Sequence, residues 1–247
     1  MRTDKNETLS PSTPFTTISI EDLSFLQLSD SFFPTGLYTT SNGLEHLFYD
    51  KNRKLSYSEI SDFIKAYLVQ QIGPTDCCVI GNVYSCLQEK DFASLLDLDN
   101  TYYFMRLVDE TRSASTRSGI QFLRCVSTFV RENENLTFYS KSIKDGLAKG
   151  VFPVSYAIGC SSMNLSKDRS GLMLLYGFVV SVIGAALRLG ILQHFEGQMM
   201  IDELKPAMLS TVLKNINQPA DEMWQFIPQL DIIQMHHEQM DSKMFIT

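Results

Sequence analysis

The side chains best suited to chemistry are few in this 247-residue sequence, which holds four histidines and five cysteines. No histidine stands in an H-E-x-x-H motif, and none is spaced from a cysteine as zinc ligands are. His236, His237 and Glu238 are adjacent and could offer metal ligands. Neighbours in a helix point about 100° apart, so they would need a partner chain to complete a shell. The sequence therefore predicts no metal site within the chain.

Motifs for catalysis are also missing. The sequence has no nucleophile elbow, no glycine-rich phosphate loop and no C-x-x-C pair, so we assign no catalytic residue and no cofactor. All-helical enzymes nevertheless assemble sites from residues scattered along the chain. One alternative therefore stays open, an enzyme with a site between helices near Glu45, His46 and Arg112.

Charge and cysteine content narrow the class of protein. Lys and Arg number 21 against 28 Asp and Glu, a net charge of −7, which argues against general binding of nucleic acid. The cysteines are odd in number, and the adjacent Cys77 and Cys78 cannot readily bridge each other. Free thiols of this kind indicate a cytoplasmic location. Residues 1–18 are rich in Thr and Ser, lack the apolar run of a signal peptide, and are expected to form a flexible tail.

The elements that must position these side chains are predicted to be helices. Glycine (13) and proline (8) are scarce, and no alternating β-branched run is present. We expect residues 19–247 to form one all-α domain, a bundle of about ten helices around a buried central helix. The clearest start is the Ser56-x-x-Glu59 capping box. Gly73-Pro74 is expected to end that helix and open the next.

Other helices are expected both before and after these two. A kink is predicted within residues 111–119, inside the helical pattern of residues 103–131. The remaining predicted helices cover residues 20–28, 151–160, 208–216, 220–227 and 232–240, the last three spaced by Pro206, Pro219 and Pro228.

Residues 171–192 form the longest apolar run, and we expect them to be the central helix, buried on all sides. Gly177, Ser181 and Ala185 recur every four residues and predict a smooth stripe where another helix approaches closely. Within this run, residues 170–187 are uncharged and just reach the length of a membrane span. Charged flanking residues and three internal glycines favour a core helix, so no membrane association is expected.

Several short motifs follow one another in a fixed order. Residues 26–36 read L-x-x-x-D-x-x-x-P-x-G, and residues 41–45 read S-N-G-L-E. The later motifs are R-x-x-S-x-x-x-G at 112–119, F-P-V at 152–154, Gly197-Gln198, and M-H-H-E at 235–238 followed by Phe245. Taken together, the order of these motifs resembles that of the UreF-type urease accessory proteins, over about residues 20–247.

This resemblance implies an all-α accessory protein, usually a homodimer, that catalyses no reaction of its own. Such proteins bind a second accessory protein, UreD or UreH, and the nickel-carrying GTPase UreG, which they are also associated with modulating. The assembly delivers nickel to apo-urease, so nickel would pass through the complex at most transiently. A water-filled route for nickel has been proposed in this family.

The resemblance also implies roles for individual residues. Glu45 matches the glutamate of S-x-G-L-E, and Arg188 occupies a basic position before the L-G-Q turn; both would lie on the GTPase side. The C-terminal stretch would pack on UreD/UreH and at the dimer interface, and its matching residues are His236, Glu238, Lys243 and Phe245. Lys243 replaces the family's arginine, whose bidentate fork lysine does not reproduce.

Overall fold

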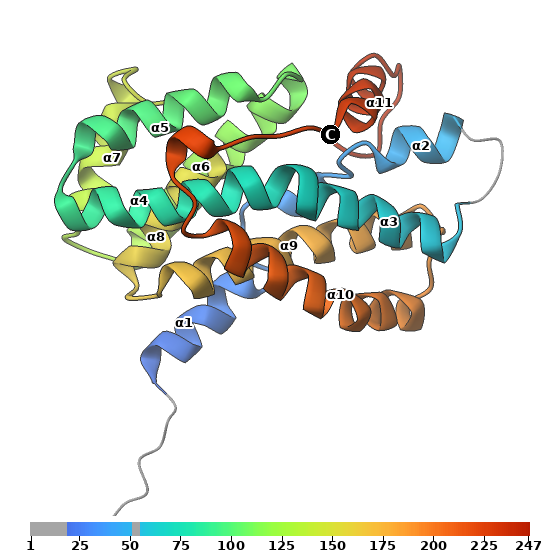
Figure 1. The fold of residues 1–247 in the computed structure, drawn as a ribbon, viewed down its shortest axis with the longest axis horizontal. Helices are drawn as coiled ribbons and strands as arrows, with labels where there is room; N and C mark the ends of the chain where they lie inside the picture. Colours follow the sequence, from blue (N-terminus) through green and yellow to red (C-terminus); the bar gives the residue numbers. More distant parts are fainter. Residues whose placement is uncertain (1–18, 51–54) are drawn as a thin grey trace, which may run out of the picture.

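The computed structural model describes residues 19–50 and 55–247 (Figure 1). The all-α prediction is confirmed, because these residues form eleven α-helices and no β-strand. The tail expected at residues 1–18 lies outside the described residues. The α-helices are α1 (Ile20–Ser29), α2 (Leu44–Asp50), α3 (Tyr57–Tyr67), α4 (Cys78–Glu89), α5 (Phe92–Met105), α6 (Asp109–Phe129), α7 (Glu134–Lys144), α8 (Phe152–Ser162), α9 (Lys167–Arg188), α10 (His194–Asn215) and α11 (Pro228–Glu238).

Local signals account for several helix starts. Ser56 accepts from the Glu59 amide while the Glu59 carboxylate accepts from the Ser56 amide, which is the capping box predicted for α3. Ser19 and Asp22 form a second box at α1. Gly150, at φ +77°, turns the chain into α8, whose first turn holds Pro153.

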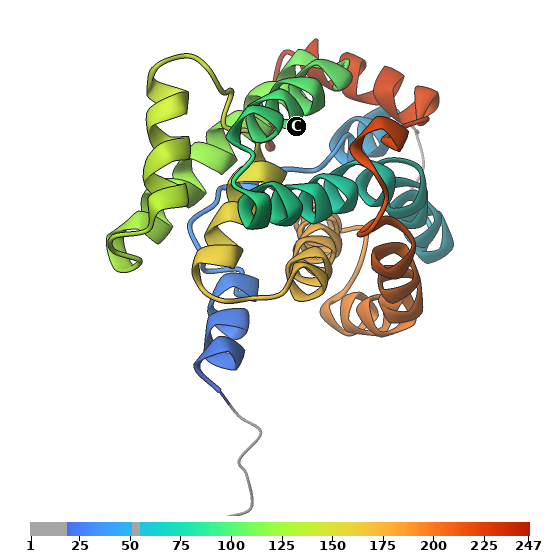
Figure 2. The same ribbon diagram turned by 60° about the vertical axis from the view of Figure 1, so that its left-hand side comes forward.

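Helix α9 is the predicted central helix, but it covers residues 167–188 instead of 171–192, and it is not buried on all sides because Tyr176 is 38% exposed. It packs against α1, α2, α3, α4, α8 and α10, and against two short segments, η1 (Leu37–Thr39) and η2 (Leu68–Cys77) (Figures 1 and 2). It is also the one described helix long and apolar enough to cross a bilayer. Because 61% of its most apolar 18-residue stretch is buried inside the fold, α9 resembles the core helix of a globular domain.

The small-residue stripe on α9 was expected to meet another helix along its length, and this is wrong at Gly177. A Cβ there would meet no atom within 4 Å, because the stripe borders a groove of about 200 Å³. Ser181 instead donates to the Leu37 carbonyl at 2.7 Å. Glycine is required by close approach at Gly81, where a Cβ would lie 1.7 Å from the Ile216 carbonyl oxygen.

The predicted helix break at Gly73-Pro74 is wrong. The chain runs from α3 into α4 through η2, a π-helical segment that contains Pro74. A proline leaves the carbonyl four residues earlier without its helical donor. Here the Phe226 amide, from a distant segment, donates to that Gln70 carbonyl at 3.0 Å, and the Thr75 hydroxyl donates to the Gln71 carbonyl at 2.7 Å. Because one distant donor and one local donor satisfy carbonyls in the turn before Pro74, the helix path continues.

The kink predicted within residues 111–119 is also wrong, because the break falls at residues 106–108, between α5 and α6. The small residues of this region serve packing instead. A Cβ on Gly119 would lie 2.2 Å from the Gly150 carbonyl oxygen, at the contact between α6 and α8. They mark a close helix crossing rather than a weak point in α6.

Proline also misled the prediction at the C-terminal end. Pro206 lies inside α10, which is continuous over His194–Asn215. Its ring is on the exposed side, where water can satisfy the carbonyl that lost its donor. The helix expected at 220–227 is a single 3₁₀ turn, Ala220–Glu222, and the last helix is α11.

Candidate functional site

The last residues of the chain fold back over the bundle beside α2. We call residues 239–247 the C-terminal strap. Its Ile246 amide donates to the Thr39 carbonyl at 2.8 Å, and its Thr247 carbonyl accepts from the Ser41 amide at 2.7 Å. These bonds hold the strap along residues 39–41, more than 200 positions earlier in the sequence.

Glu45, at the start of α2, anchors the strap. Its side chain is 1% exposed. One carboxylate oxygen accepts from the Met244 amide at 2.7 Å, and the other accepts from the Phe245 amide at 3.1 Å. The second oxygen also lies 3.0 Å from Nε2 of His237 on α11. A single buried carboxylate thus joins α2, α11 and the strap.

His237 extends this contact into a network. Its Nδ1 lies 2.8 Å from Glu110 on α6, so both ring nitrogens face carboxylate oxygens. Each ring nitrogen donates to its carboxylate oxygen when it carries a hydrogen. The other Glu110 oxygen accepts from Lys243 of the strap at 2.9 Å, and Lys243 also donates to the Glu238 carbonyl. We call Glu45, Glu110, His237 and Lys243 the strap network.

Arg188, at the end of α9, adds a second anchor. Its Nη2 donates to the Tyr38 carbonyl at 2.5 Å and its Nε to the Gly184 carbonyl at 3.1 Å. The guanidinium lies over the rings of Tyr38, at 3.9 Å, and of Phe245, at 4.4 Å. Burial lowers the pKa of Arg188, while Tyr38 opposes that shift. Arg188 therefore holds Phe245 of the strap by a cation–π contact.

The structure brings together residues that the sequence assigned to two separate surfaces. Glu45 and Arg188 were predicted on the GTPase side, and Lys243 and Phe245 on the other side, yet all four meet at the strap. Glu45 and Phe245 are buried, so any effect of theirs on partner binding would act through the position of the strap. Their roles with partners stay predictions.

The other two predicted residues lie at the edge of this cluster. Glu238 is exposed and contributes its backbone carbonyl to the Lys243 contact. His236 is exposed, and its ring centroid lies 5.2 Å from that of His46, in an edge-to-face arrangement. Burial lowers the pKa of His46, Asp50 opposes the shift, and His236 and His237 add to it.

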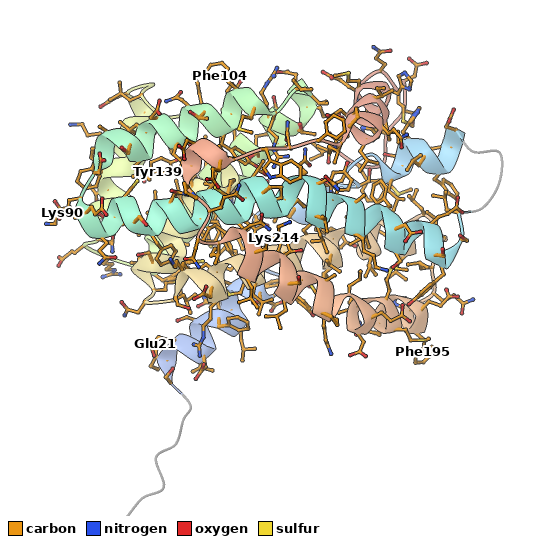
Figure 3. All side chains as sticks on the ribbon, in the orientation of Figure 1. Glu21, Lys90, Phe104, Tyr139, Phe195 and Lys214 are labelled. Atoms are coloured by element: carbon orange, nitrogen blue, oxygen red, sulfur yellow. The ribbon has the colours of Figure 1, made fainter. Side chains whose placement is uncertain are left out.

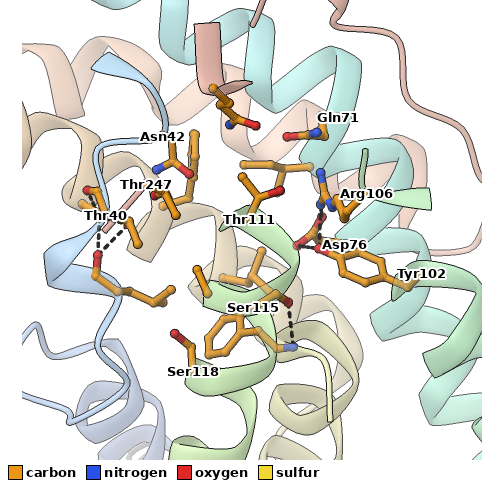
Figure 4. Close-up of a pocket in the computed structure, with 18 residues that line it drawn as sticks. Thr40, Asn42, Gln71, Asp76, Tyr102, Arg106, Thr111, Ser115, Ser118 and Thr247 are labelled. Atoms are coloured by element: carbon orange, nitrogen blue, oxygen red, sulfur yellow. Dashed lines mark hydrogen bonds and ion pairs between the residues drawn. The ribbon is translucent and has the colours of Figure 1, made fainter. Parts of the chain in front are cut away.

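A cavity of about 120 Å³ lies behind the strap (Figure 4). Thr40, Asn42 and Thr247 line one side of it, and Asp76, Tyr102 and Arg106 line the other (Figure 4). The hydroxyl of Thr247 is buried there without a hydrogen-bond partner in the structure. The strap thus forms part of the wall of this cavity.

A buried ion pair borders this cavity. Arg106 lies 2.5 Å from Asp76 and donates to the Tyr102 hydroxyl at 2.6 Å, while Tyr102 donates to Asp76 at 3.0 Å. Burial opposes the charge of Arg106, but Tyr102 and Asp76 outweigh it and raise its pKa. Because these polar atoms bond one another, the pair holds η2 against the end of α5.

The neighbouring thiols are structural. All five cysteines are free, as predicted, and Cys77 and Cys78 are fully buried. Burial raises the pKa of Cys78 to about 11. A thiol of this kind stays protonated near neutral pH and packs as a small apolar side chain.

The three side chains of the alternative enzyme site do not converge. Glu45 binds the strap, His46 faces His236, and Arg112 donates to the Arg106 and Leu107 carbonyls at 2.8 and 3.2 Å. Arg112 also pairs with Asp109 at 2.9 Å. It therefore closes the turn between α5 and α6.

Sequence reasoning missed His237 and Glu110 in the network and Asp76 and Arg106 at the cavity. One signal was available, because the M-x-H-E pattern places its histidine at 237 and not at 236. For Asp76, the clue was a carboxylate directly before the apolar residues 77–80. Glu110 gave no local signal, since acidic residues are common in the first turn of a helix.

Comparisons with known proteins agree on one family. The family model described as UreF matches residues 56–205. The chain is 29% identical over 225 residues to the urease accessory protein UreF of Trichodesmium erythraeum, covering 91% of this chain and 96% of that protein. It is 26% identical over 230 residues to the urease accessory protein UreF of a Bacillus species, covering 91% and 98%. Its identity to the Actinobacillus pleuropneumoniae protein of the same description is 24% over 224 residues, covering 90% and 97%.

Proposed function

Because this chain belongs to the UreF family of urease accessory proteins, we propose that it acts in the cytoplasm as a non-enzymatic scaffold for urease maturation. In this role it joins the UreD/UreH accessory protein and the UreG GTPase so that nickel enters apo-urease. It works as a homodimer and modulates the GTPase. Nickel is the cargo of the assembly and passes this chain at most transiently.

The strap network is the observation that carries this proposal. A scaffold that binds two partners can couple their binding through contacts that both partners change. Glu45, Arg188 and the strap connect α2, α9 and α11, so a partner resting on the strap changes the same contacts that hold the neighbouring helices. This arrangement supports a binding role at this end of the molecule.

Exposed apolar side chains support association with other chains. Phe104 on α5 and Phe195 on α10 stand at the periphery of the molecule (Figure 3), 68% and 85% exposed. On α10, Phe195, Met199, Leu209 and Leu213 are each more than half exposed. Exposed apolar side chains that gather into a large patch commonly mark an interaction surface.

The test is reconstitution with partners from the same organism. The purified chain is mixed with UreD/UreH and UreG, and the molar mass of the assembly is measured by light scattering after size-exclusion chromatography. We expect a complex containing all three proteins, and activation of apo-urease when nickel and GTP are supplied. Removal of the residues after Met235 should abolish binding of UreD/UreH.

Two outcomes would contradict the proposal. The first is that no complex forms under any stoichiometry. The second is that the truncated chain still co-elutes with UreD/UreH, which would make the strap dispensable. The Lys205→Ala variant is the matched control, because it removes an exposed ion pair with Asp202 and should leave assembly unchanged.

A further inference from the structure

A groove of about 210 Å³ lies between helix α6 and the segment at residues 35–40. One wall is formed by residues of that segment, and the other wall by Arg117, Ser118 and Gln121 of α6. A water molecule takes up about 30 Å³ in the liquid, so this space corresponds to roughly seven waters. The groove is therefore large enough for a small ligand.

The lining of this groove carries one positive charge and no negative charge. Arg117 supplies the charge, and no Asp or Glu is among the lining residues, although the chain as a whole has a net charge of −7. Within residues 19–50 and 55–247, no carboxylate pairs with this guanidinium and no group accepts a hydrogen bond from it. Arg117 is exposed, so its donors are available to a ligand from solution.

Neutral donors surround the same space. Ser118 is buried, and among the described residues neither its hydroxyl nor the side-chain amide of Gln121 makes a hydrogen bond. The Thr35 hydroxyl accepts from the Leu37 amide at 3.3 Å and keeps its own hydrogen for another partner. These three side chains and Arg117 all line the groove. An acceptor-rich ligand would therefore meet donors from both walls.

Gly36 keeps the groove open at its narrow point. Its φ of +81° suits glycine, and a Cβ there would lie 3.9 Å from the Ser118 hydroxyl oxygen, inside the space that a ligand needs. Ala114 and Ile246 add an apolar part to the lining. The groove thus combines a cluster of donors with a small apolar surface.

We propose that this groove is a binding site for a phosphate group, held by Arg117, Ser118 and Gln121. A planar guanidinium donates two parallel hydrogen bonds to phosphate oxygens. A phosphate group presents three strong acceptor oxygens, so it can accept from the hydroxyl and the amide as well, whereas a carboxylate has only two oxygens. With no carboxylate in its lining, the groove does not suit a cation. The proposal does not rest on the chain's role in urease maturation.

The test follows backbone amide shifts of the ¹⁵N-labelled full chain by NMR at constant ionic strength, which holds screening fixed. The chain is titrated with inorganic phosphate and, separately, with phenyl phosphate. We expect saturable shifts at the Gly36 and Ser118 amides. The dissociation constant should rise about tenfold or more in Arg117→Gln and about threefold or more in Ser118→Ala. Arg117→Lys keeps the charge without the two parallel bonds and should fall between Arg117→Gln and the unmodified chain.

Arg124→Gln is the matched control. Arg124 is exposed on the same helix, seven residues after Arg117, and does not line the groove, so its loss should leave phosphate binding unchanged. Tighter binding of phenyl phosphate would support the site and assign it to a small phosphomonoester, through the apolar part of the lining. Equal or weaker binding would support the site and assign it to inorganic phosphate.

Three results would overturn the proposal. The first is that neither compound gives saturable shifts in the unmodified chain. The second is that Arg117→Gln binds phosphate as the unmodified chain does. The third is that Arg124→Gln loses as much affinity as Arg117→Gln, which would reduce the effect to the general charge of α6. Because Arg117 and Arg124 are both exposed, circular dichroism of the two variants should match that of the unmodified chain.

Discussion

Replacing Glu45 by alanine should release the C-terminal strap while the helical bundle stays folded. The side chain accepts from the Met244 and Phe245 amides and contacts His237, all in a buried setting. Removing the acceptor leaves these groups without a partner, and each buried unpaired polar group costs about 1–3 kcal/mol. Breaking a buried charged contact by removing one partner costs about 3–5 kcal/mol.

The cost should appear as local opening rather than global unfolding. The strap is joined to the bundle by a small set of bonds, so its detachment rehydrates the orphaned amides for less free energy than melting the core. A loss of about 3 kcal/mol corresponds to more than a hundredfold faster amide exchange. We expect this acceleration at the Phe245 and Ile246 amides, with no change at amides of α9.

Native-state hydrogen exchange followed by NMR or mass spectrometry measures this effect directly. Glu45→Gln keeps one carbonyl oxygen as acceptor and should fall between the alanine variant and the unmodified chain. Asp202→Ala, which removes an exposed ion pair, should leave strap exchange within a few tenths of a kcal/mol. Unchanged protection of the strap in Glu45→Ala would refute the assignment of Glu45 as its anchor. In reconstitution, the same variant should weaken GTPase-dependent activation of urease without loss of helix content.

Three further predictions concern the bundle itself. Gly81→Val should destabilise the fold by about 3 kcal/mol or more in urea unfolding, because a Cβ would lie 1.7 Å from the Ile216 carbonyl oxygen; equal stability would contradict the close packing. Asp76→Ala should cost about 3–5 kcal/mol by stranding the buried Arg106, and adding Arg106→Met should recover part of that loss. Burial raises the pKa of Asp99 above its ordinary 3.8, so the stability this group supplies is full below about pH 3.8 and is lost as pH rises through the higher folded value. Asp99→Asn should remove that downward slope from the pH dependence of unfolding free energy, and a slope that persists would assign it to another group.

The sequence correctly predicted the helix ends that depend on residues only a few positions apart. The capping box at Ser56 and the turn at Gly150 place helix ends through residues a few positions apart, and both ends fall where expected. Pro74 and Pro206 follow equally well-founded local rules and gave wrong boundaries. At Pro74 the missing donor is replaced by Phe226, from more than 150 residues away, and no window of the sequence contains both.

In the candidate site, too, the sequence indicated residues that belong to motifs but not the contacts between distant segments. Motif order pointed to Glu45, Lys243 and Phe245, but only the fold shows that they contact one another. His236 and His237 are neighbours in sequence but differ in burial, because adjacent side chains on α11 project about 100° apart, so that one is exposed and the other is buried. Glu110 and Arg106 could not be found, since their partners lie on other helices and each resembles an ordinary surface charge in sequence.

The distance along the chain between the strap and its seat has a consequence for biosynthesis. Thr247 binds Ser41 across 206 positions, so Glu45 is translated long before the residues that cover it. Until then its carboxylate lacks the Met244 and Phe245 amides that donate to it in the finished fold. The contact between α2 and the strap is therefore among the last to form, because both partners must be present first. The Glu45→Ala variant should remove these same two contacts from a chain in which α11 has already formed.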